Sequence, residues 1–282
     1  MNRFKTALLL ILLSVLLVGT GSYLGGRQGA IFALVMAAAI NFVSYWWSDK
    51  IVLRMYRARE VSEAEYSELY NVVMGLAQSA SIPMPRVYVI PTDSPNAFAT
   101  GRNPQHAAVA VTEGILRILN RRELTGVLGH ELSHVLHRDI LIGSVAATIA
   151  GAISWMGSMF RWGAIFGGGG DSNNRGGNVI FALVVSMVVS LAAMLIQLAI
   201  SRTREYGADE GGAKLTHDPE ALASALEKLE ASRQVAPMAD VNPATAHMFI
   251  VNPLSGRGLQ RLFSTHPSTE ERVQRLRAMQ QG

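Results

Sequence analysis

Residues 120–137 read NRRELTGVLGHELSHVLH, and the fold and chemistry of the chain can be worked out from this stretch outward. Its apolar residues have helical spacing, which predicts a helix that begins at Asn120 or Arg121 and covers the rest of the stretch. His130 and His134 are four residues apart, and on a helix such side chains lie one above the other on the same face. Both imidazoles can therefore reach a single metal ion.

The five residues His130-Glu131-Leu132-Ser133-His134 match the HExxH pattern, in which two histidines hold a zinc ion and the glutamate acts as a general base. Zinc accepts nitrogen and oxygen ligands in a tetrahedral set. The chain has no cysteine, so any metal site must use histidines and carboxylates. The alternative is a surface helix with two solvated histidines.

A second acidic pair could complete this site, because a catalytic zinc ion usually has three protein ligands and one open position. In the segment Glu205-Tyr206-Gly207-Ala208-Asp209, the two carboxylates are four residues apart and share one face of a helix. We expect Glu205 to be the third ligand and Asp209 to hold a ligand imidazole through a hydrogen bond. Without the histidine motif, Glu205 would be interpreted as pairing with Arg202 or Arg204 on a solvated helix.

Composition indicates that part of the chain lies in lipid. Of the 282 residues, 49% are hydrophobic and 16% are charged, whereas roughly 25% charged residues are usual in soluble domains. The net charge of +4 suits an anionic membrane surface but is too diffuse to indicate nucleic-acid binding. We therefore expect the lipid bilayer, and no nucleic acid, among the partners.

Four apolar runs are each close to the ~20 residues that cross a bilayer as a helix. They cover residues 7–24, 30–47, 140–160 and 179–200. The second run ends in Tyr45-Trp46-Trp47, and aromatic residues are typical of the membrane–water interface. We interpret the runs as two transmembrane hairpins. The alternatives are a cleaved signal peptide for the first run and a buried, non-spanning hairpin for the last two.

Basic residues flank these runs asymmetrically, and cytoplasmic loops are enriched in Lys and Arg. With the N-terminus inside, only Arg27, Arg161 and Arg175 would lie on the outer side. If the cell is bacterial, this predicts a multi-pass inner-membrane protein whose soluble part lies in the cytoplasm. The same topology returns the chain after the fourth run to the side of His134, which brings Glu205 to the level of the two histidines.

Several motifs together resemble the HtpX family of bacterial membrane-bound zinc metalloproteases, which is related to the prenyl-protein (CAAX) metalloproteases. They are Asn96-Ala97-Phe98-Ala99-Thr100-Gly101, Gly129-His130-Glu131-Leu132-Ser133-His134, Ser201-Arg202-Thr203-Arg204-Glu205-Tyr206-Gly207-Ala208-Asp209 and Thr265-His266-Pro267-Ser268. The resemblance covers nearly the whole chain. It implies that His130, His134 and Glu205 bind one Zn²⁺ per chain and that Glu131 is the catalytic carboxylate. It also implies a stress-response role in quality control, with endopeptidase cleavage of misfolded or damaged membrane proteins at the cytoplasmic face.

Two further groups of residues are candidates for contacts with a membrane-protein or unfolded polypeptide substrate. Asn96, Ala97 and Phe98 begin a β-prone stretch that could pair, as an edge strand, with an extended peptide. The alternative is an ordinary strand of the sheet. His266 could donate a hydrogen bond in the transition state, or it could cap or pack before the last helix.

The fold class that follows is a mostly α-helical membrane protein with a small β-sheet, in which a zincin-like HExxH metalloprotease domain is joined to transmembrane helices. Strands are expected at residues 86–90, 96–100 and 107–112, and a helix over residues 61–80. We divide the chain into an N-terminal transmembrane hairpin (1–48), a first cytoplasmic protease segment (49–139), a second transmembrane hairpin (140–200) and a second protease segment (201–282). Residues 234–258 match no role.

Two other functions fit parts of the sequence. An intramembrane protease of the site-2 type would carry HExxH inside a span, but charged residues such as Arg122 and Asp139 bracket the motif here. An inactive membrane scaffold or chaperone would not need the complete set of His130, Glu131, His134 and Glu205.

Overall fold

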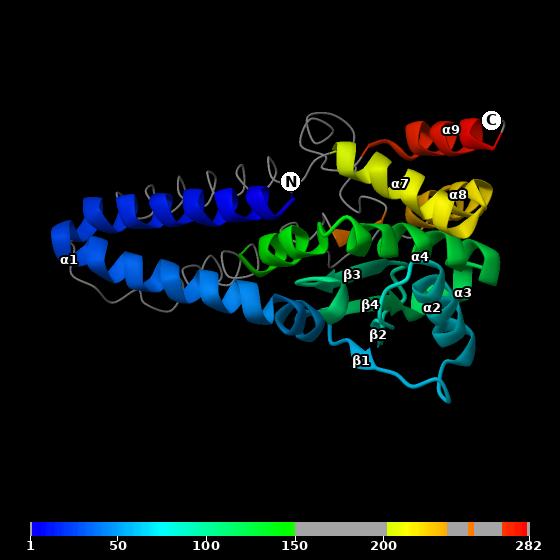
Figure 1. Ribbon diagram of the computed structural model, residues 1–282, viewed down its shortest axis with the longest axis horizontal. Coiled ribbons are helices and arrows are strands. Elements are labelled where there is room, and N and C mark those ends of the chain that lie inside the picture. Colours follow the sequence, from blue (N-terminus) through cyan, green and yellow to red (C-terminus); the bar gives the residue numbers. More distant parts are fainter. Residues whose placement is uncertain (1, 150–201, 236–247, 251–266, 281–282) are drawn as a thin grey trace.

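The computed structural model describes residues 2–149, 202–235, 248–250 and 267–280. Most of them are helical, and the strands form one small mixed sheet, as expected (Figure 1). In chain order the elements are α1 (Asn2–Met55), β1 (Arg59–Glu60), α2 (Ser67–Ser79), β2 (Arg86–Ile90), β3 (Ala97–Gly101), η1 (Pro104–His106), β4 (Ala107–Thr112), α3 (Glu113–Ile118), α4 (Arg121–Leu136), α7 (Arg202–Thr216), α8 (Pro219–Val235) and α9 (Thr269–Met279). The fourth apolar run lies outside the described residues.

Helix α1 is a hairpin of two apolar arms that meet at a sharp bend (Figure 1). Gly25 and Gly26 leave the helical conformation there, and Gly26 has a φ of +55°, which glycine adopts without steric cost. The arms, Thr6–Tyr23 and Gly25–Met55, have mean hydropathies of 2.0 and 1.7, and each is long enough to cross a membrane. The two N-terminal apolar helices expected from the sequence are therefore confirmed.

The sheet has the strand order β1-β2-β4-β3. β2 and β4 are parallel, with Val87 opposite Val109, whereas β1 and β3 run antiparallel to their neighbours. β2 and β4 have the predicted bounds, and β3 begins one residue later than predicted. Alternate residues face opposite layers: one face packs against α2 and α4, and the other packs against the end of α1. β3 is an edge strand and lies against α4.

The helix expected over residues 61–80 is shorter than predicted, because α2 begins only at Ser67. The Val61 amide donates to the Val87 carbonyl at 3.0 Å and so extends the sheet. Glu65 then accepts hydrogen bonds from Ser62 in a turn. Apolar spacing does not reveal this boundary, since Val61 buries its side chain equally well beside the sheet.

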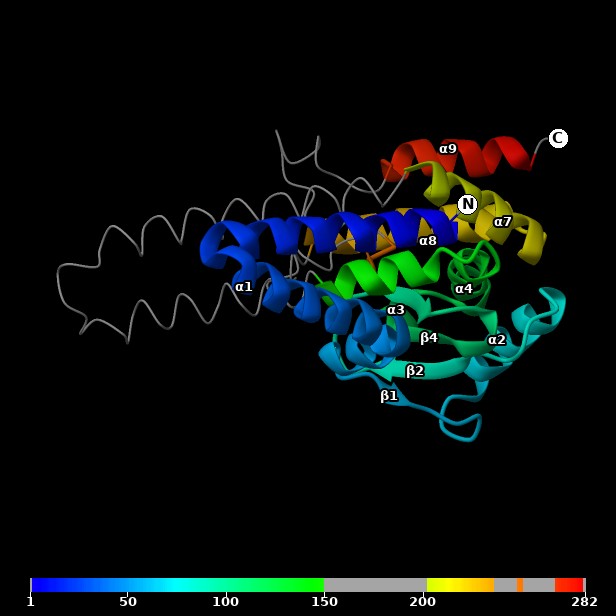
Figure 2. The same ribbon diagram turned by 60° about the vertical axis from the view of Figure 1, so that its left-hand side comes forward.

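α4 is the central helix, with the sheet on one side, α7 and α8 on the other, and α9 outside those two (Figures 1 and 2). Its start is fixed by a capping box, in which the side chains of Asn120 and Glu123 each accept a hydrogen bond from the other residue's backbone amide. Glycine at position 212 allows α7 to come close to α4, because a Cβ there would lie 2.7 Å from the backbone nitrogen of His130. The motif helix is therefore held directly against α7.

The chain continues from α4 into an apolar helix, Ile140–Ile149. Ile142 and Val145 of this helix belong to one buried cluster with Leu9 and Leu13 from the first arm of α1. The start of the third apolar run is thus helical and packs against the N-terminal hairpin, while the rest of that run lies outside the described residues.

Candidate metal centre

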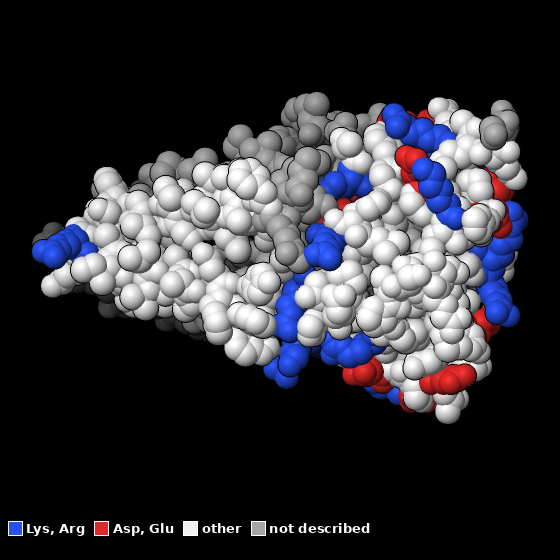
Figure 3. All heavy atoms as spheres, viewed as in Figure 1, with Lys and Arg blue, Asp and Glu red and all other residues white. Residues whose placement is uncertain are grey.

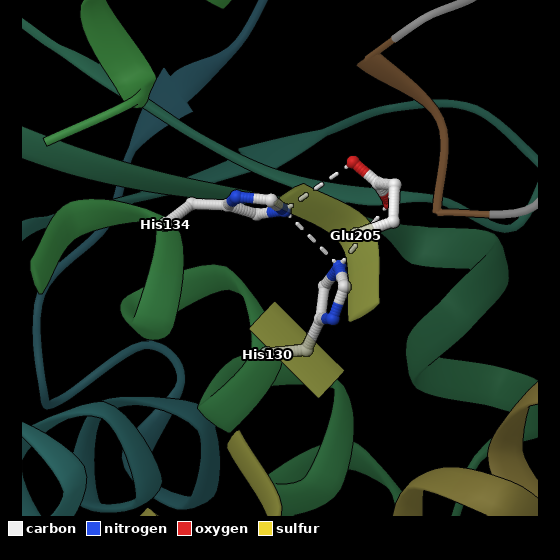
Figure 4. A group of neighbouring side chains, drawn as sticks. All are labelled: His130, His134 and Glu205. Atoms are coloured by element: carbon white, nitrogen blue, oxygen red, sulfur yellow. Dashed lines mark hydrogen bonds and ion pairs between the residues drawn. The ribbon is translucent and has the colours of Figure 1, made fainter. Parts of the chain in front are cut away.

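Three potential ligands converge between α4 and α7. His130 and His134 project from the same face of α4, and Glu205 faces them from the first turn of α7 (Figure 4). The two Nε2 atoms are 3.2 Å apart. The Glu205 carboxylate oxygens lie 3.8 Å from His130 Nε2 and 3.7 Å from His134 Nε2. The helical spacing on α4 and the packing of α7 against it therefore bring together the side chains that the sequence singled out.

The other nitrogen of each imidazole faces a carboxylate. His130 Nδ1 lies 2.9 Å from Asp209 Oδ1, and His134 Nδ1 lies 3.2 Å from Asp139 Oδ2. A carboxylate accepts a hydrogen bond, so in its neutral, metal-binding form each imidazole carries the proton on Nδ1 and has a lone pair on Nε2. Both lone pairs are thus directed to the same point beside Glu205, as required for ligands to one ion.

The dimensions of this group fit a tetrahedral metal ion. Bonds of about 2.1 Å in a tetrahedron separate neighbouring ligand atoms by about 3.4 Å. The three separations here are 3.2, 3.7 and 3.8 Å. Two imidazole nitrogens and one carboxylate oxygen, without sulfur, are the donors of many catalytic zinc sites. His130, His134 and Glu205 could therefore hold zinc and leave a fourth position open.

Electrostatics around His134 favour a positive charge. Burial disfavours the charged imidazole, but the hydrogen bond to Asp139 and the charges of Asp139, Glu205 and Glu131 outweigh it and raise the pKa of His134 to about 9. A cation is thus strongly stabilised at this position. The same carboxylates would stabilise a divalent ion between the two histidines.

Asp209 is itself fixed by Arg272 on α9. The Arg272 guanidinium donates from Nε and Nη2 to the two Asp209 oxygens at 2.9 and 2.7 Å, and from Nη1 to the Ile250 carbonyl at 2.7 Å. Arg272 is only 1% exposed. Burial would raise the pKa of Asp209, but Arg272 and His130 lower it to about 2, so the carboxylate stays ionised.

Glu131 is buried beside the three potential ligands without belonging to them. Its Oε2 accepts a hydrogen bond of 3.0 Å from the backbone amide of Ala99 in β3. Burial raises the pKa of Glu131 above its ordinary value, although His130 and His134 oppose this. A carboxylate with a raised pKa next to a metal position is suited to taking up and releasing a proton.

A cavity opens onto these side chains. Its walls include Phe98 and Ala99 of β3 together with Met248, Phe249 and Ile250. Ala97 is fully buried in β3. Asn96 is buried too, and its Oδ1 accepts a hydrogen bond of 3.2 Å from the Ile250 amide, so it holds one wall in place. His266 lies outside the described residues.

Reasoning from the sequence missed Asp139, Arg272 and the segment 248–250. Asp139 is five residues beyond His134, outside the helix, and it returns to the histidine through a left-handed turn. Arg138 has a φ of +57°, its amide donates to the Val135 carbonyl, and the Asp139 amide donates to the His134 carbonyl. This is a Schellman turn. Such turns usually have glycine at the position of Arg138, so the sequence does not indicate that a turn of this kind occurs here.

Comparisons with known proteins agree with this geometry. The family model described as Peptidase family M48 matches residues 63–280. A protease HtpX homolog of Syntrophotalea carbinolica is 57% identical over 279 residues and covers 99% of both chains. The homolog of Thermodesulfovibrio yellowstonii is 58% identical and covers 99% of both chains. The homolog of Thermococcus kodakarensis is 55% identical over 97% of this chain and 94% of its own.

The fold is also similar to the crystal structure of S. mikatae Ste24p, with a TM-score of 0.53 and 18% identity. The match covers 96% of this chain and 62% of that one. The family match implies a metal cofactor, and the His130, His134 and Glu205 cluster is where the described residues could hold it. The chain therefore belongs to peptidase family M48 and, within it, to the HtpX group of membrane-associated metalloproteases.

Proposed function

We propose that this protein is a zinc-dependent endopeptidase at the cytoplasmic face of the membrane, where it hydrolyses peptide bonds of misfolded or damaged membrane proteins. The observation that carries the chemistry is the convergence of His130 Nε2, His134 Nε2 and the Glu205 carboxylate beside a buried Glu131. The apolar hairpin supports the membrane location, and the relatives named proteases support the reaction class.

Each side chain has a defined part in this proposal. His130, His134 and Glu205 hold the ion, Asp209 and Asp139 keep the imidazoles oriented, and Glu131 is the acid–base group. When bound, zinc supplies Lewis acidity, which makes water a nucleophile at neutral pH and polarises a carbonyl. This division leaves Glu131 free for proton transfer.

Glu131 takes the proton from the attacking water and delivers it to the leaving amine. The Ala99 amide holds Oε2 of its carboxylate, which keeps the side chain in one orientation throughout. Its raised pKa makes the protonated form accessible, as donation to the amine requires. The peptide bond breaks as the carbonyl carbon gains the water oxygen and the nitrogen gains the proton.

The edge of β3 that faces away from β4 borders the cavity and supports an extended substrate. The Ala99 amide donates to Glu131 and the Gly101 amide is directed to Ser144 Oγ at 3.4 Å, so the odd-numbered backbone groups face away from β4. In an antiparallel ladder, the carbonyls of the same residues face outward too. Ala97 is fully buried and the Ala99 amide already binds Glu131, so a peptide could pair with this edge through the Ala99 carbonyl while its side chains enter the cavity.

The environment of α4 argues against the two alternative functions. An intramembrane protease carries its motif in a lipid-embedded helix, whereas α4 packs against α2, α7, α8 and β3. An inactive scaffold or chaperone would not retain oriented imidazoles together with a buried Glu131. Both observations support hydrolysis outside the bilayer core.

The test is cleavage of casein by the purified full chain, before and after removal of metal by a chelator. We expect loss of activity, recovery with zinc, and no recovery with magnesium, which prefers oxygen ligands. Glu131→Gln should keep about one zinc ion per chain and lose nearly all cleavage. Substantial turnover by metal-free protein, or by Glu131→Gln, would contradict the proposed function.

A further inference from the structure

A second cavity, separate from the metal site, lies where the second arm of α1 meets the sheet. We call it the junction groove. It has a volume of about 540 Å³, and its walls include Phe42, Trp46, Trp47, Lys50, Arg86 and Arg102. The apolar hairpin supplies the aromatic residues, while the start of β2 and the turn between β3 and β4 supply the arginines. The groove therefore combines an apolar side with a basic side.

Its position matches the membrane–water interface. Phe42, Trp46 and Trp47 are 57%, 44% and 42% exposed at the end of an otherwise apolar arm, and exposed tryptophans are enriched at headgroup depth. On the face drawn in Figure 3, the hairpin is almost free of charge except at its tip, and Lys and Arg gather where it meets the globular part. The junction groove thus opens at the level of phospholipid headgroups.

Only some of the cationic side chains in the groove are neutralised by a carboxylate. Arg86 donates to Asp49 at 2.8 Å, so that pair is neutral. Arg102 stacks on the Trp46 ring, with its central carbon 4.5 Å from the ring centroid, and its Nη2 donates to His106 Nε2 at 2.9 Å. Within the described part of the chain, neither Arg102 nor Lys50 forms an ion pair. Two cationic side chains therefore remain available to an anion.

We propose that the junction groove binds one anionic phospholipid. The anionic phosphodiester contacts Arg102 and Lys50, and an acyl chain follows Phe42 and Trp47 along the hairpin. Trp46 fixes the guanidinium by cation–π stacking, so Arg102 loses little conformational freedom on binding. Basic pockets beside transmembrane helices are a known means of selecting anionic lipids.

The acyl chain distinguishes this ligand from free phosphate. A soluble phosphate would use Arg102 and Lys50 alone and leave the exposed aromatic residues without a partner. A zwitterionic lipid would fill the apolar side but would bring a positive charge of its own next to Arg102 and Lys50. Only an anionic lipid satisfies both halves of the groove.

Native mass spectrometry of the purified full chain in detergent tests this proposal. Phosphatidylglycerol and phosphatidylcholine of equal chain length are added together, and the ratio of the two bound lipids is measured. We expect the wild type to retain one phosphatidylglycerol in preference. Arg102→Gln and Lys50→Gln should each lower the ratio about fivefold, or about 1 kcal/mol per charge. Trp46→Leu should lower it less.

Arg121→Gln is the matched control, because it removes from the start of α4 an exposed cation that forms no ion pair with the residues that the structure describes. A ratio measured on one sample reports selectivity among folded molecules, so a poorly folding variant still gives a valid answer. Equal retention of both lipids by the wild type would overturn the proposal. So would an equal effect of Arg121→Gln, or displacement of the lipid by millimolar glycerol 3-phosphate.

Discussion

Arg272 on α9 and Asp209 on α7 form a bidentate ion pair, with both side chains buried and two hydrogen bonds of 2.9 and 2.7 Å. Asp209 in turn faces His130 Nδ1 at 2.9 Å. The orientation of the His130 imidazole is therefore linked, through the Asp209 carboxylate, to α9, which follows His130 in the chain by more than a hundred residues. Four consequences of this site and its surroundings can be measured.

Arg272→Gln should destabilise the fold and weaken zinc binding together. Asp209 would remain buried without its cation, and breaking a buried pair costs about 3–5 kcal/mol. The freed carboxylate would also orient His130 less well. We expect a lower unfolding temperature with zinc present and a weaker zinc affinity in competition with a chelator dye. Arg275→Gln, on the exposed side of the same helix, is the control. Unchanged zinc affinity in Arg272→Gln would separate Arg272 from the metal site.

Three carboxylates on α7 should differ in their effect on metal content. Glu205→Gln should lose most zinc and all activity, because it removes a ligand. Asp209→Asn should weaken zinc affinity by roughly 10–100-fold, as is typical when the group that orients a ligand is changed. Glu210→Gln should do little, since Glu210 is exposed and pairs with Lys214 at 2.5 Å. Metal content of the purified variants gives the answer, and full zinc in Glu205→Gln would refute its assignment as a ligand.

Asp139→Asn should weaken zinc binding although residue 139 is not a ligand. The amide can present its NH₂ group to His134 Nδ1, which would favour the wrong tautomer and direct a proton at the metal position. We expect a loss of affinity similar to that of Asp209→Asn. Asp93→Asn is a suitable control, because the Asp93 side chain is 94% exposed. If both variants bind zinc like the wild type, the His134–Asp139 contact has no role in the site.

Single cysteines can test the proposed orientation, since the chain has none of its own. Gln28→Cys lies in the exposed tip of the hairpin, and Gln280→Cys follows α9. With the protease segments in the cytoplasm, an impermeant thiol reagent should label intact cells only at residue 28. Labelling at residue 280 alone would reverse the topology.

The parts of the fold that the sequence predicted well are those that local chemistry determines. The HExxH helix begins at a capping box and keeps its period, and the strands at Arg86–Ile90 and Ala107–Thr112 alternate between two buried faces. The convergence of His130, His134 and Glu205 also followed from helical spacing together with the chain returning to one side. The helix and the strands needed no knowledge of distant contacts, whereas the approach of Glu205 was expected from the predicted membrane topology.

The parts that could not be predicted depend on contacts between distant segments. Arg272 lies in a helix with an ordinary polar pattern, and nothing local indicates that its guanidinium is buried against Asp209. Ile250 belongs to a stretch without periodicity, yet its backbone binds both Asn96 and Arg272. Buried polar partners of this kind are selected by the assembled fold rather than by the neighbouring sequence.

The left-handed turn at Arg138 has a further consequence for which changes of chain length the protein tolerates. The turn both stops α4 and delivers Asp139 to His134. Side chains in this segment can vary, but the number of peptide units between the histidine and the carboxylate cannot. One inserted or deleted residue would rotate the following apolar helix and remove the carboxylate from the imidazole at once. This short turn should therefore accept substitutions far more readily than insertions or deletions.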